Sequence, residues 1–324
     1  MTTTTSAHTA RRTGAGPGNS RMRARRQRDG GPAMLMAAPA VLGLAAFVAV
    51  PFIVAIVLSF YDAQLNQVRT PKFFGFTQYV RLFTDPVVAG PFFRSLLNNL
   101  VFAIVVIPVQ TAIALGLAIL LNSKLKGIPV FRTIFFMPVV FPMALVAVIW
   151  RLILDRSGNG LLNAFTGFVT AGHFVPQDWL GSAGTALGAV ILLSIWQGAG
   201  FQMVIILAGL QEIPTERFEA ASLDRANAWQ QFIHITLPGL RNTLIFVTLY
   251  TTIMAFQLYD QVYILIKTAG GNQTALQTVL YQGTSSLFDE NNLGRAAAVT
   301  VVFFAIVLVI ALVQRSLLKQ RTEE

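Results

Sequence analysis

The chain has 324 residues, of which 54% are hydrophobic and 12% are charged, with a formal net charge of +10 and no cysteine. Soluble domains carry about 25% charged residues, so this composition excludes an ordinary soluble domain and favours one membrane domain. Without cysteine, the chain can form no disulfide, thiolate metal site or cysteine nucleophile.

The first 32 residues combine Thr, Gly, Ser, Pro and Arg without apolar periodicity, which predicts a disordered tail at 1–32. Seven arginines gather in this tail, at positions Arg11, Arg12, Arg21, Arg23, Arg25, Arg26 and Arg28. Arginine clusters before a first apolar run are typical topology signals. They therefore indicate a cytoplasmic tail, and we expect no nucleic-acid partner.

Six apolar stretches follow, each long enough to cross a bilayer once its flanks are included. The expected spans are residues 33–60, 97–121, 131–153, 185–209, 242–265 and 295–314, within a transmembrane domain at 33–318 that precedes a short tail at 319–324. Six spans put both termini on one side of the membrane, and the arginine cluster assigns that side to the cytosol. The predicted fold class is an all-α membrane protein with six transmembrane helices and cytoplasmic termini.

Two further charge-free stretches, 157–177 and 268–288, are rich in Gly, Ser, Thr, Asn and Gln. Lipid would leave their polar groups without hydrogen-bond partners. Both stretches are therefore predicted to be loops.

Catalytic motifs are absent from the sequence. It contains no Gly-x-x-x-x-Gly-Lys-Ser/Thr phosphate loop and no Gly-x-Ser-x-Gly motif, and its three histidines, His8, His173 and His234, lack zinc-protease spacing. We therefore expect no enzyme activity, no cofactor and no metal site.

The connection after the fourth span, residues 211–240, is the polar segment with the clearest helix signals. Thr215 is predicted to cap one short helix and Asn227 a second, which Pro238 ends. Helices this short do not persist alone in water. They must dock, either on the chain's own bundle or on a partner.

Polar and aromatic side chains share one face of the fourth span. Ser194, Gln197 and Phe201 recur at three and four residues, which places them on one side of a helix. A hydroxyl, an amide and an aromatic ring suit a sugar, but the same residue types also serve helix packing.

An ionisable side chain lies near the outer end of the fifth span. Asp260, with Gln257 one turn before it, is a candidate for the transport path, since such groups are costly in a membrane unless they face a cavity or a partner. Structural pairing of Asp260, for instance with Lys267 or with the next subunit, is the alternative.

One motif in the 211–240 connection identifies a family. The pattern Glu219-Ala220-Ala221-x-x-Asp224-x-Ala226, followed by Phe232, Ile235, Leu237 and Pro238, resembles the EAA loop of ABC-importer permease subunits, which in that family docks on a cytoplasmic ATPase. The resemblance implies these ATPase-coupling residues: Glu219, Ala220, Ala221, Asp224, Arg225, Ala226, Leu237 and Pro238. In the family the acid at Glu219 meets a basic residue of the ATPase.

Arg225 departs from the family pattern, which has Gly at that position. Glycine adopts a positive φ freely, whereas another residue costs about 1–2 kcal/mol there. Arg225 therefore either makes a strained turn or contacts the ATPase directly.

Further motifs between about residues 35 and 318 resemble carbohydrate-type permeases of the maltose and glycerol-phosphate group. They include Phe74-Gly75-Phe76-x-x-Tyr79, Leu82-Phe83-x-Asp85-Pro86, Phe131-Arg132-Thr133, Gly160-Leu161-Leu162-Asn163, Ala208-Gly209-Leu210-Gln211 and Tyr259-Asp260. The resemblance implies a type I ABC-importer permease fold in the inner or plasma membrane. It also adds Thr251 to the substrate path, because family subunits line their cavity on that helix.

The implied function is half of the translocation pathway for a sugar or oligosaccharide. The implied partners are a second, different permease subunit, a cytoplasmic ATP-binding-cassette ATPase dimer, an extracytoplasmic solute-binding protein, the sugar and membrane lipid. A glycerol-phosphate-type importer is the alternative within the family. A channel or secondary transporter is the alternative outside it, although the inverted repeats of secondary transporters are not seen.

Overall fold

The structure, a computed structural model, describes residues 30–66, 70–123, 125–158 and 160–320. The predicted tails at 1–32 and 319–324 therefore lie largely outside the described residues. By its internal contacts the chain divides into two compact units, Met1–Ala55 and Ile56–Glu324. The larger unit contains every residue that the sequence assigns to a site.

A continuous helical segment makes up the described part of the first unit. Its elements are α2 (Gly30–Leu44), the π-helical turn η1 (Ala45–Ala49) and α3 (Val50–Leu58). In η1 the N–H of Val50 bonds to the carbonyl of Ala45, and Pro51, which follows, has no N–H to donate. Residues 30–32 were predicted to belong to the tail but are part of α2.

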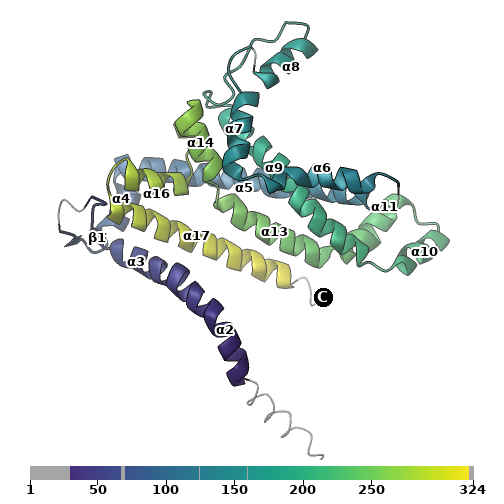
Figure 1. Cartoon of the computed structure of the whole chain (residues 1–324), viewed down its shortest axis with the longest axis horizontal. Helices are drawn as coiled ribbons and strands as arrows, with labels where there is room; N and C mark the ends of the chain where they lie inside the picture. The colour runs from purple at the N-terminus through teal and green to yellow at the C-terminus, as the bar shows by residue number, and fades with distance from the viewer. Residues whose placement is uncertain (1–29, 67–69, 124, 159, 321–324) are drawn as a thin grey trace, which may run out of the picture. The chain divides into compact units, whose positions relative to one another are not determined.

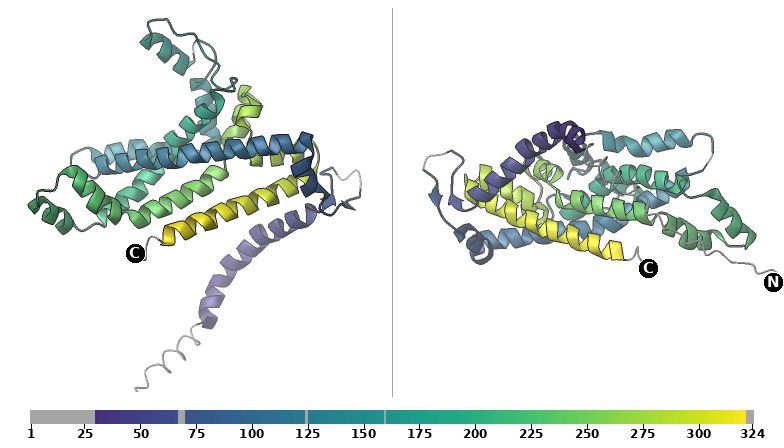
Figure 2. Two further views of the ribbon diagram at one scale, coloured as in Figure 1. Left: turned by 180° about the vertical axis from the view of Figure 1, so that it is seen from behind. Right: turned by 90° about the horizontal axis from the view of Figure 1, so that it is seen from below.

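Helices that pack side by side form the body of the second unit (Figures 1 and 2). They are α5 (Pro86–Leu121), α6 (Ile128–Val140), α9 (Ala186–Gln211), α13 (Arg241–Phe256) and α17 (Leu293–Gln320). α7 (Met143–Ile153) points away from this bundle and packs against α14 (Asp260–Ala269) (Figure 1). α5 packs along α9 and α13, and α17 packs against α13. Buried side chains form two hydrophobic clusters, one around Phe92 and Val190 and the other around Ala114 and Met203.

α5 begins at Pro86, well before the expected span at 97–121. The Asp85 side chain accepts a hydrogen bond from the backbone N–H of Val87 at 3.0 Å, and Pro86 occupies the first helical position, where its missing N–H costs nothing. This start signal is visible in the sequence. The expected span begins later because it was drawn from charge-free residues, and Arg94 interrupts the apolar run.

The third expected span, 131–153, is two helices and not one. α6 and α7 meet at an angle of 100°, and the residues between them are Phe141 and Pro142. Proline restricts the preceding residue to extended backbone, and Phe141 has φ −78° and ψ 136°. The Phe141-Pro142 pair thus breaks the span.

Gly200 allows α6 to pack closely on α9. A Cβ atom at Gly200 would lie 2.1 Å from the carbonyl oxygen of Phe135 in α6, a distance that backbone atoms must move to avoid.

We therefore expect Gly200→Ala to destabilise the protein by about 1–3 kcal/mol, as overpacking does in well-packed interiors. The check is the melting temperature of the purified transporter in detergent. Gly188→Ala is the matched control on the same helix, since a Cβ at Gly188 meets nothing within 4 Å. Equal melting temperatures for the two variants would contradict the close α6–α9 contact.

The predicted loops at 157–177 and 268–288 are wrong in secondary structure, because both stretches contain helices. The first contains α8 (Leu161–Val169), and the second holds the end of α14 (Asp260–Ala269), α15 (Gln273–Leu276) and α16 (Val279–Phe288). In the first stretch, the polar side chain of Asn163 finds its hydrogen-bond partners within the protein. Asn163 Nδ2 donates to the carbonyl of Gln177 at 3.0 Å, and Asn163 Oδ1 accepts from the Trp179 indole at 2.8 Å.

The two ends of the second unit differ in structure (Figure 1). One end carries a short antiparallel pair, β1 (Tyr61–Asp62) and β2 (Lys72–Phe73), with α4 (Thr77–Thr84) and α16 beside it. The other end carries α10 (Thr215–Leu223), α11 (Ala228–Gln231), the π-helical turn η2 (Phe232–Thr236) and α12 (Leu237–Gly239).

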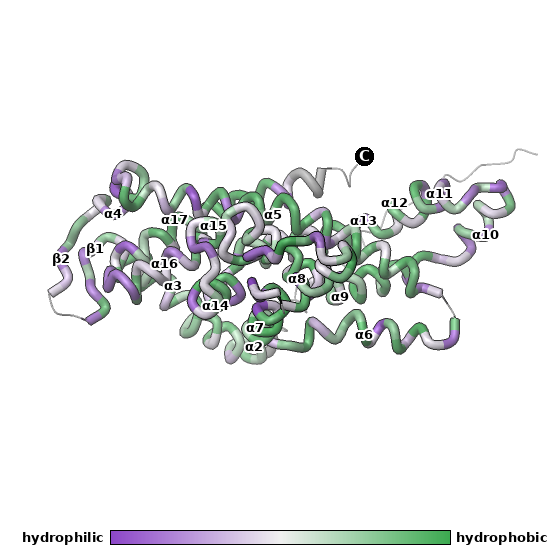
Figure 3. The backbone as a smooth tube through the Cα atoms, turned by 90° about the horizontal axis from the view of Figure 1, so that it is seen from above, coloured by the Kyte–Doolittle hydropathy of each residue, from purple (hydrophilic) through white to green (hydrophobic). Residues whose placement is uncertain are grey.

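The chain is mostly helical, as predicted, and its helices include membrane-spanning candidates. Four helices of the described chain are long and apolar enough to cross a membrane, or six if each of two bent pairs counts as one span. The bent pairs are α6 with α7 and, at 67°, Ala228–Gly239 with Arg241–Ala269. Apolar residues dominate α5 and α9, whereas the connection that carries α10 is more hydrophilic (Figure 3).

Candidate functional site

A cavity of about 280 Å³ lies among α5, α6, α7, α9, α13 and α14 in the second unit. Its lining is Phe102, Val106, Gln110, Val139, Met143, Ser194, Gln197, Gly198, Phe201, Tyr250, Thr251, Met254, Ala255 and Gln261. Four of the six predicted path residues, Ser194, Gln197, Phe201 and Thr251, therefore meet at one cavity.

The other two predicted path residues do not line this cavity. α13 ends at Phe256 and α14 starts at Asp260, so the expected fifth span is interrupted, and Gln257 and Asp260 are exposed. Of the two structural partners predicted for Asp260, Lys267 is not its partner, because the Lys267 ammonium pairs with Asp289 at 3.0 Å. Pairing of Asp260 with the next subunit stays a prediction.

Two glutamines that the sequence analysis overlooked complete the cavity. Gln110 comes from α5 and Gln261 from α14. Gln110 is 7% exposed, and its amide has no hydrogen-bond partner within the described residues. Gly198 makes room for it, since a Cβ there would lie 2.4 Å from Gln110 Nε2. A lone amide in an apolar span was the signal that could have revealed Gln110.

The Gln197 side chain bonds to the break between α6 and α7, and its amide oxygen remains free to accept a hydrogen bond. Gln197 Nε2 donates to the Phe141 carbonyl at 3.1 Å, which satisfies a backbone group at the α6–α7 break. Gln197 Oε1 is buried and has no partner within the described residues. A buried unpaired acceptor costs about 1–3 kcal/mol, so a ligand hydroxyl that donates to this oxygen would be stabilised.

Other polar groups of the cavity are already engaged. The Ser194 hydroxyl donates to the Val190 carbonyl at 2.8 Å, and Thr251 donates to Val247 at 2.7 Å. The Gln202 amide, behind the cavity, donates to the Thr251 hydroxyl. These two hydroxyl bonds lie within single helices, whereas Gln202 joins α9 to α13, and Gln261 Nε2 donates to the Ser194 hydroxyl at 3.4 Å and so joins α14 to α9. Ser194 and Thr251 therefore link helices as well as lining the cavity.

An aromatic pair forms one wall. The rings of Phe201 in α9 and Tyr250 in α13 have centroids 5.1 Å apart at an interplanar angle of 40°. Together with the free amides, these rings give the cavity apolar faces and hydrogen-bonding groups without a charged side chain in its described lining.

The segment 211–240 forms the predicted pair of short helices, with one correction. Thr215 is the first helical residue of α10 and makes no capping hydrogen bond; the cap position is Pro214. Asn227 caps α11 as predicted, because its Oδ1 accepts from the backbone N–H of Gln230 at 2.9 Å while the Gln230 side chain accepts from the N–H of Asn227 at 2.8 Å. The helix that includes Pro238 ends at Gly239.

Arg225 adopts the left-handed turn, with φ +57°. The N–H of Ala226 bonds to the Ala221 carbonyl at 2.9 Å, and the N–H of Arg225 bonds to Ser222 at 3.1 Å. These two bonds define a Schellman motif, whose penultimate residue requires positive φ. The turn expected of glycine is thus formed by arginine.

Replacing Arg225 with Gly should relieve this strain and stabilise the transporter by about 1 kcal/mol. The measurement is thermal unfolding of the purified complex, with Arg225→Ala as the control that keeps the Cβ. If Arg225→Gly is more stable but transports more slowly, the Arg225 guanidinium contacts the ATPase.

The predicted coupling residues face solvent in this chain. Glu219, Asp224 and Arg225 are exposed, and α10 buries none of its residues. Large apolar side chains beside them are also exposed, Leu223 at 85% and Trp229 at 68%. Ile213 and Leu240, near the two ends of the segment, are buried in the core of the bundle, and Phe218 and Ile235 pack against that core. The segment is therefore anchored on the bundle while its coupling residues stay exposed, which favours docking on a partner over folding back.

Comparison with known proteins gives the family. Residues 82–323 match the family described as binding-protein-dependent transport system inner membrane component. The chain is 31% identical over 284 residues to the arabinooligosaccharides transport system permease protein AraP of Bacillus subtilis, which covers 87% of each protein. It is 30% identical over 282 residues to the lactose transport system permease protein LacF of Rhizobium radiobacter, covering 86% of this chain and 91% of that protein.

A solved structure has the same fold. It is the crystal structure of a bacterial ABC transporter involved in the import of the acidic polysaccharide alginate, and one of its chains matches with a TM-score of 0.76 at 19% identity over 93% of this chain and 99% of that chain. From its sequence, this chain belongs to the family of inner membrane components of binding-protein-dependent transport systems, and is a multi-pass transport protein rather than an enzyme.

Proposed function

We propose that the chain forms half of the translocation pathway of an ABC importer for a neutral sugar or oligosaccharide. The observation that carries this proposal is the central cavity, which combines the Gln110 amide and the free amide oxygen of Gln197 with the Phe201–Tyr250 wall and has no charged group in its described lining. The relatives AraP and LacF, named for arabinooligosaccharides and lactose, support it.

The cavity can satisfy both the polar hydroxyls and the apolar C–H face of a sugar. Sugar hydroxyls leave water for the cavity and need replacement hydrogen bonds, since an unpaired buried polar group costs about 1–3 kcal/mol. Gln197 Oε1 accepts from a hydroxyl, and the Gln110 amide both donates and accepts. The apolar C–H face of the ring packs on Phe201.

A phosphorylated polyol fits this cavity less well. Phosphate binding in proteins relies on Arg, Lys or several backbone N–H groups, and the described lining has no Arg or Lys. The glycerol-phosphate alternative is therefore disfavoured.

In this proposal the chain works with a second, different permease subunit, a cytoplasmic ATPase dimer and an extracytoplasmic solute-binding protein. A solved alginate transporter of the same fold is in complex with an alginate pentasaccharide-bound periplasmic protein. The end that carries α10 and α11 faces the cytosol and docks on the ATPase through Glu219, Ala220, Ala221, Asp224, Arg225, Ala226, Leu237 and Pro238. Six spans, with each bent pair counted as one, then place both termini on that side.

The experiment is uptake by proteoliposomes that contain the complete assembly and enclosed ATP. The test substrates are maltotriose, lactose, arabinotriose and glycerol 3-phosphate, each supplied with the solute-binding protein. We expect ATP-dependent uptake of at least one neutral sugar and none of glycerol 3-phosphate. Uptake of glycerol 3-phosphate alone would contradict a neutral cavity.

A further inference from the structure

A second, smaller pocket of about 100 Å³ lies between α14 and α16, toward the end of the second unit opposite α10 (Figure 1). Three tyrosine rings, Tyr259, Tyr263 and Tyr281, and the ion pair of Lys267 with Asp289 line it. None of these residues lines the central cavity.

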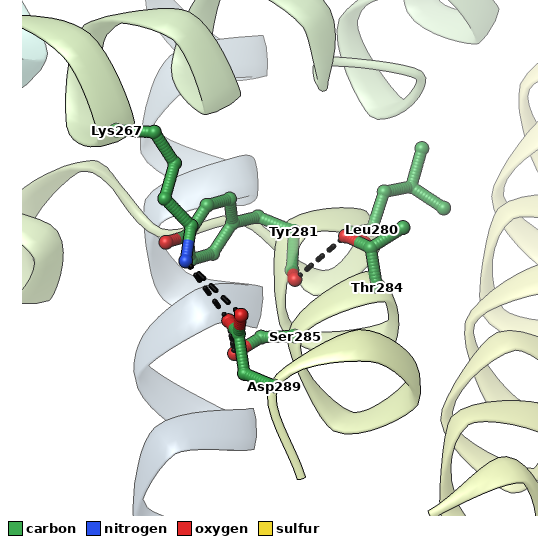
Figure 4. Close-up of polar contacts among 6 residues, drawn as sticks. All are labelled: Lys267, Leu280, Tyr281, Thr284, Ser285 and Asp289. Carbon is green, nitrogen blue, oxygen red and sulfur yellow. Dashed lines mark hydrogen bonds and ion pairs between the residues drawn. The ribbon is translucent and has the colours of Figure 1, made fainter. Parts of the chain in front are cut away.

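The ion pair is fixed in place by several contacts (Figure 4). Lys267 Nζ lies 3.0 Å from Asp289 Oδ2 and 3.2 Å from Oδ1, and the Ser285 hydroxyl donates to Asp289 at 2.8 Å. The Lys267 ammonium, followed by the Ser285 hydroxyl, holds the pKa of the Asp289 carboxyl below its usual range. The pocket therefore offers hydrogen-bond donors and acceptors in fixed positions without net charge.

The aromatic side of the pocket contains an unused hydroxyl. The rings of Tyr259 and Tyr263 have centroids 5.6 Å apart, and those of Tyr263 and Tyr281 are 6.4 Å apart. Tyr281 is 2% exposed, and its ring lies beside the Lys267 side chain (Figure 4). Tyr281 lines the pocket, and its hydroxyl makes no hydrogen bond within the described residues, so it can exchange one with a ligand.

Of a phosphate, an acyl chain and a neutral sugar, the sugar fits this pocket best. A lipid or free phosphate would meet Asp289 beside Lys267, which cancels the attraction of the ammonium. An acyl chain would bury the ion pair without replacing its water. A neutral sugar ring instead packs its C–H face on tyrosine and exchanges hydrogen bonds with Lys267, Asp289 and the Tyr281 hydroxyl.

We infer that this pocket, the outer pocket, is a second binding subsite for one neutral sugar ring, distinct from the central cavity. The inference rests on the proposed sugar import. α14 connects the two sites, since Gln261 on this helix lines the central cavity while Tyr263 and Lys267 line the outer pocket.

Single cysteines test the outer pocket directly, because the chain has no cysteine of its own. Tyr263→Cys places a thiol in the outer pocket, and Met254→Cys places one in the central cavity. The complete assembly, built with cysteine-free partners in nanodiscs, is treated with a water-soluble methanethiosulfonate reagent. The probes are maltotriose, lactose and arabinotriose at increasing concentration, with dihexanoyl phosphatidylglycerol as the lipid probe.

We expect one of the sugars to slow modification of both cysteines, and the lipid to slow neither. A control cysteine at Phe168 on α8, a position that is 85% exposed, reacts at the same rate with and without sugar. Adding Tyr281→Phe to the Tyr263→Cys chain removes only the phenol hydroxyl. It should raise the sugar concentration for half protection roughly 2- to 10-fold, as expected for one hydrogen bond, and adding it to the Met254→Cys chain should change nothing.

Each other result overturns the inference in a distinguishable way. Protection of the thiol at 254 without protection at 263 removes the outer subsite and leaves the proposed function standing. No protection at either position by any sugar contradicts both. Protection at 263 by the lipid alone makes the pocket a lipid site. If Tyr281→Phe does not change the protection at 263, the protection arises from a conformational change elsewhere and not from sugar bound in the outer pocket.

Discussion

Reversing the charge of Glu219 should abolish transport while the chain still assembles in the membrane. Glu219 is exposed on α10, which buries none of its residues, and the family motif pairs this acid with a base on the ATPase. Glu219→Lys turns that attraction into a repulsion at a contact where losing one partner of an ion pair costs about 3–5 kcal/mol once desolvated. Sugar-stimulated ATP hydrolysis should be lost with transport.

The controls separate coupling from folding. Glu212→Lys makes the same charge change at another exposed residue, at the end of α9, and should transport normally. Glu219→Gln, which removes the charge without reversing it, should give an intermediate rate. Normal transport by Glu219→Lys would show that α10 is not the coupling element.

Truncating Phe201 should weaken sugar uptake more than any other substitution in the central cavity. Phe201→Ala removes the ring that contacts Tyr250 at 5.1 Å, and with it about 1–3 kcal/mol of apolar burial and aromatic contact with the sugar. The half-saturating concentration for uptake should therefore rise by about 5- to 150-fold. Uptake by reconstituted transporter across a range of sugar concentrations measures this.

Leu192→Ala is the matched control for Phe201→Ala, because Leu192 lies on the same helix and is 50% exposed outside the cavity lining. We expect it to leave the half-saturating concentration unchanged. Equal effects of the two substitutions would make this face of α9 a packing face.

Local patterns predicted much of this arrangement. Helix periodicity was enough to group Ser194, Gln197 and Phe201, since all three lie on one helix. The Schellman turn at Arg225 follows from six consecutive residues and from the family's use of Gly there. Both depend on the chain's local geometry, which sequence spacing determines directly.

Features that join distant segments could not be predicted in the same way. Gln110 and Gln261 reach the cavity from α5 and α14 only because α5 packs along α9 and α14 packs against α7. The Thr278 hydroxyl donates to the Leu258 carbonyl at 2.9 Å, within the break between α13 and α14. That break places Gln261 in the cavity lining and leaves Asp260 exposed, a change that periodicity through a continuous fifth span cannot anticipate.

The choice of ion pair shows the same limit. Lys267 and Asp260 lie two helical turns apart on one helix, which made them a reasonable pair on sequence spacing. Lys267 instead pairs with Asp289, which follows α16 and approaches α14 only after the intervening residues have folded.

The source of energy for uptake tests the central claim most directly. Proteoliposomes holding the complete assembly and its sugar-loaded binding protein would be supplied either with enclosed ATP or with an imposed proton or sodium gradient. A permease half driven by an ATPase takes up sugar with enclosed ATP, loses that uptake in the Glu219→Lys variant, and takes up none on a gradient alone. Sugar accumulation on an ion gradient without ATP would contradict this function and indicate a secondary transporter.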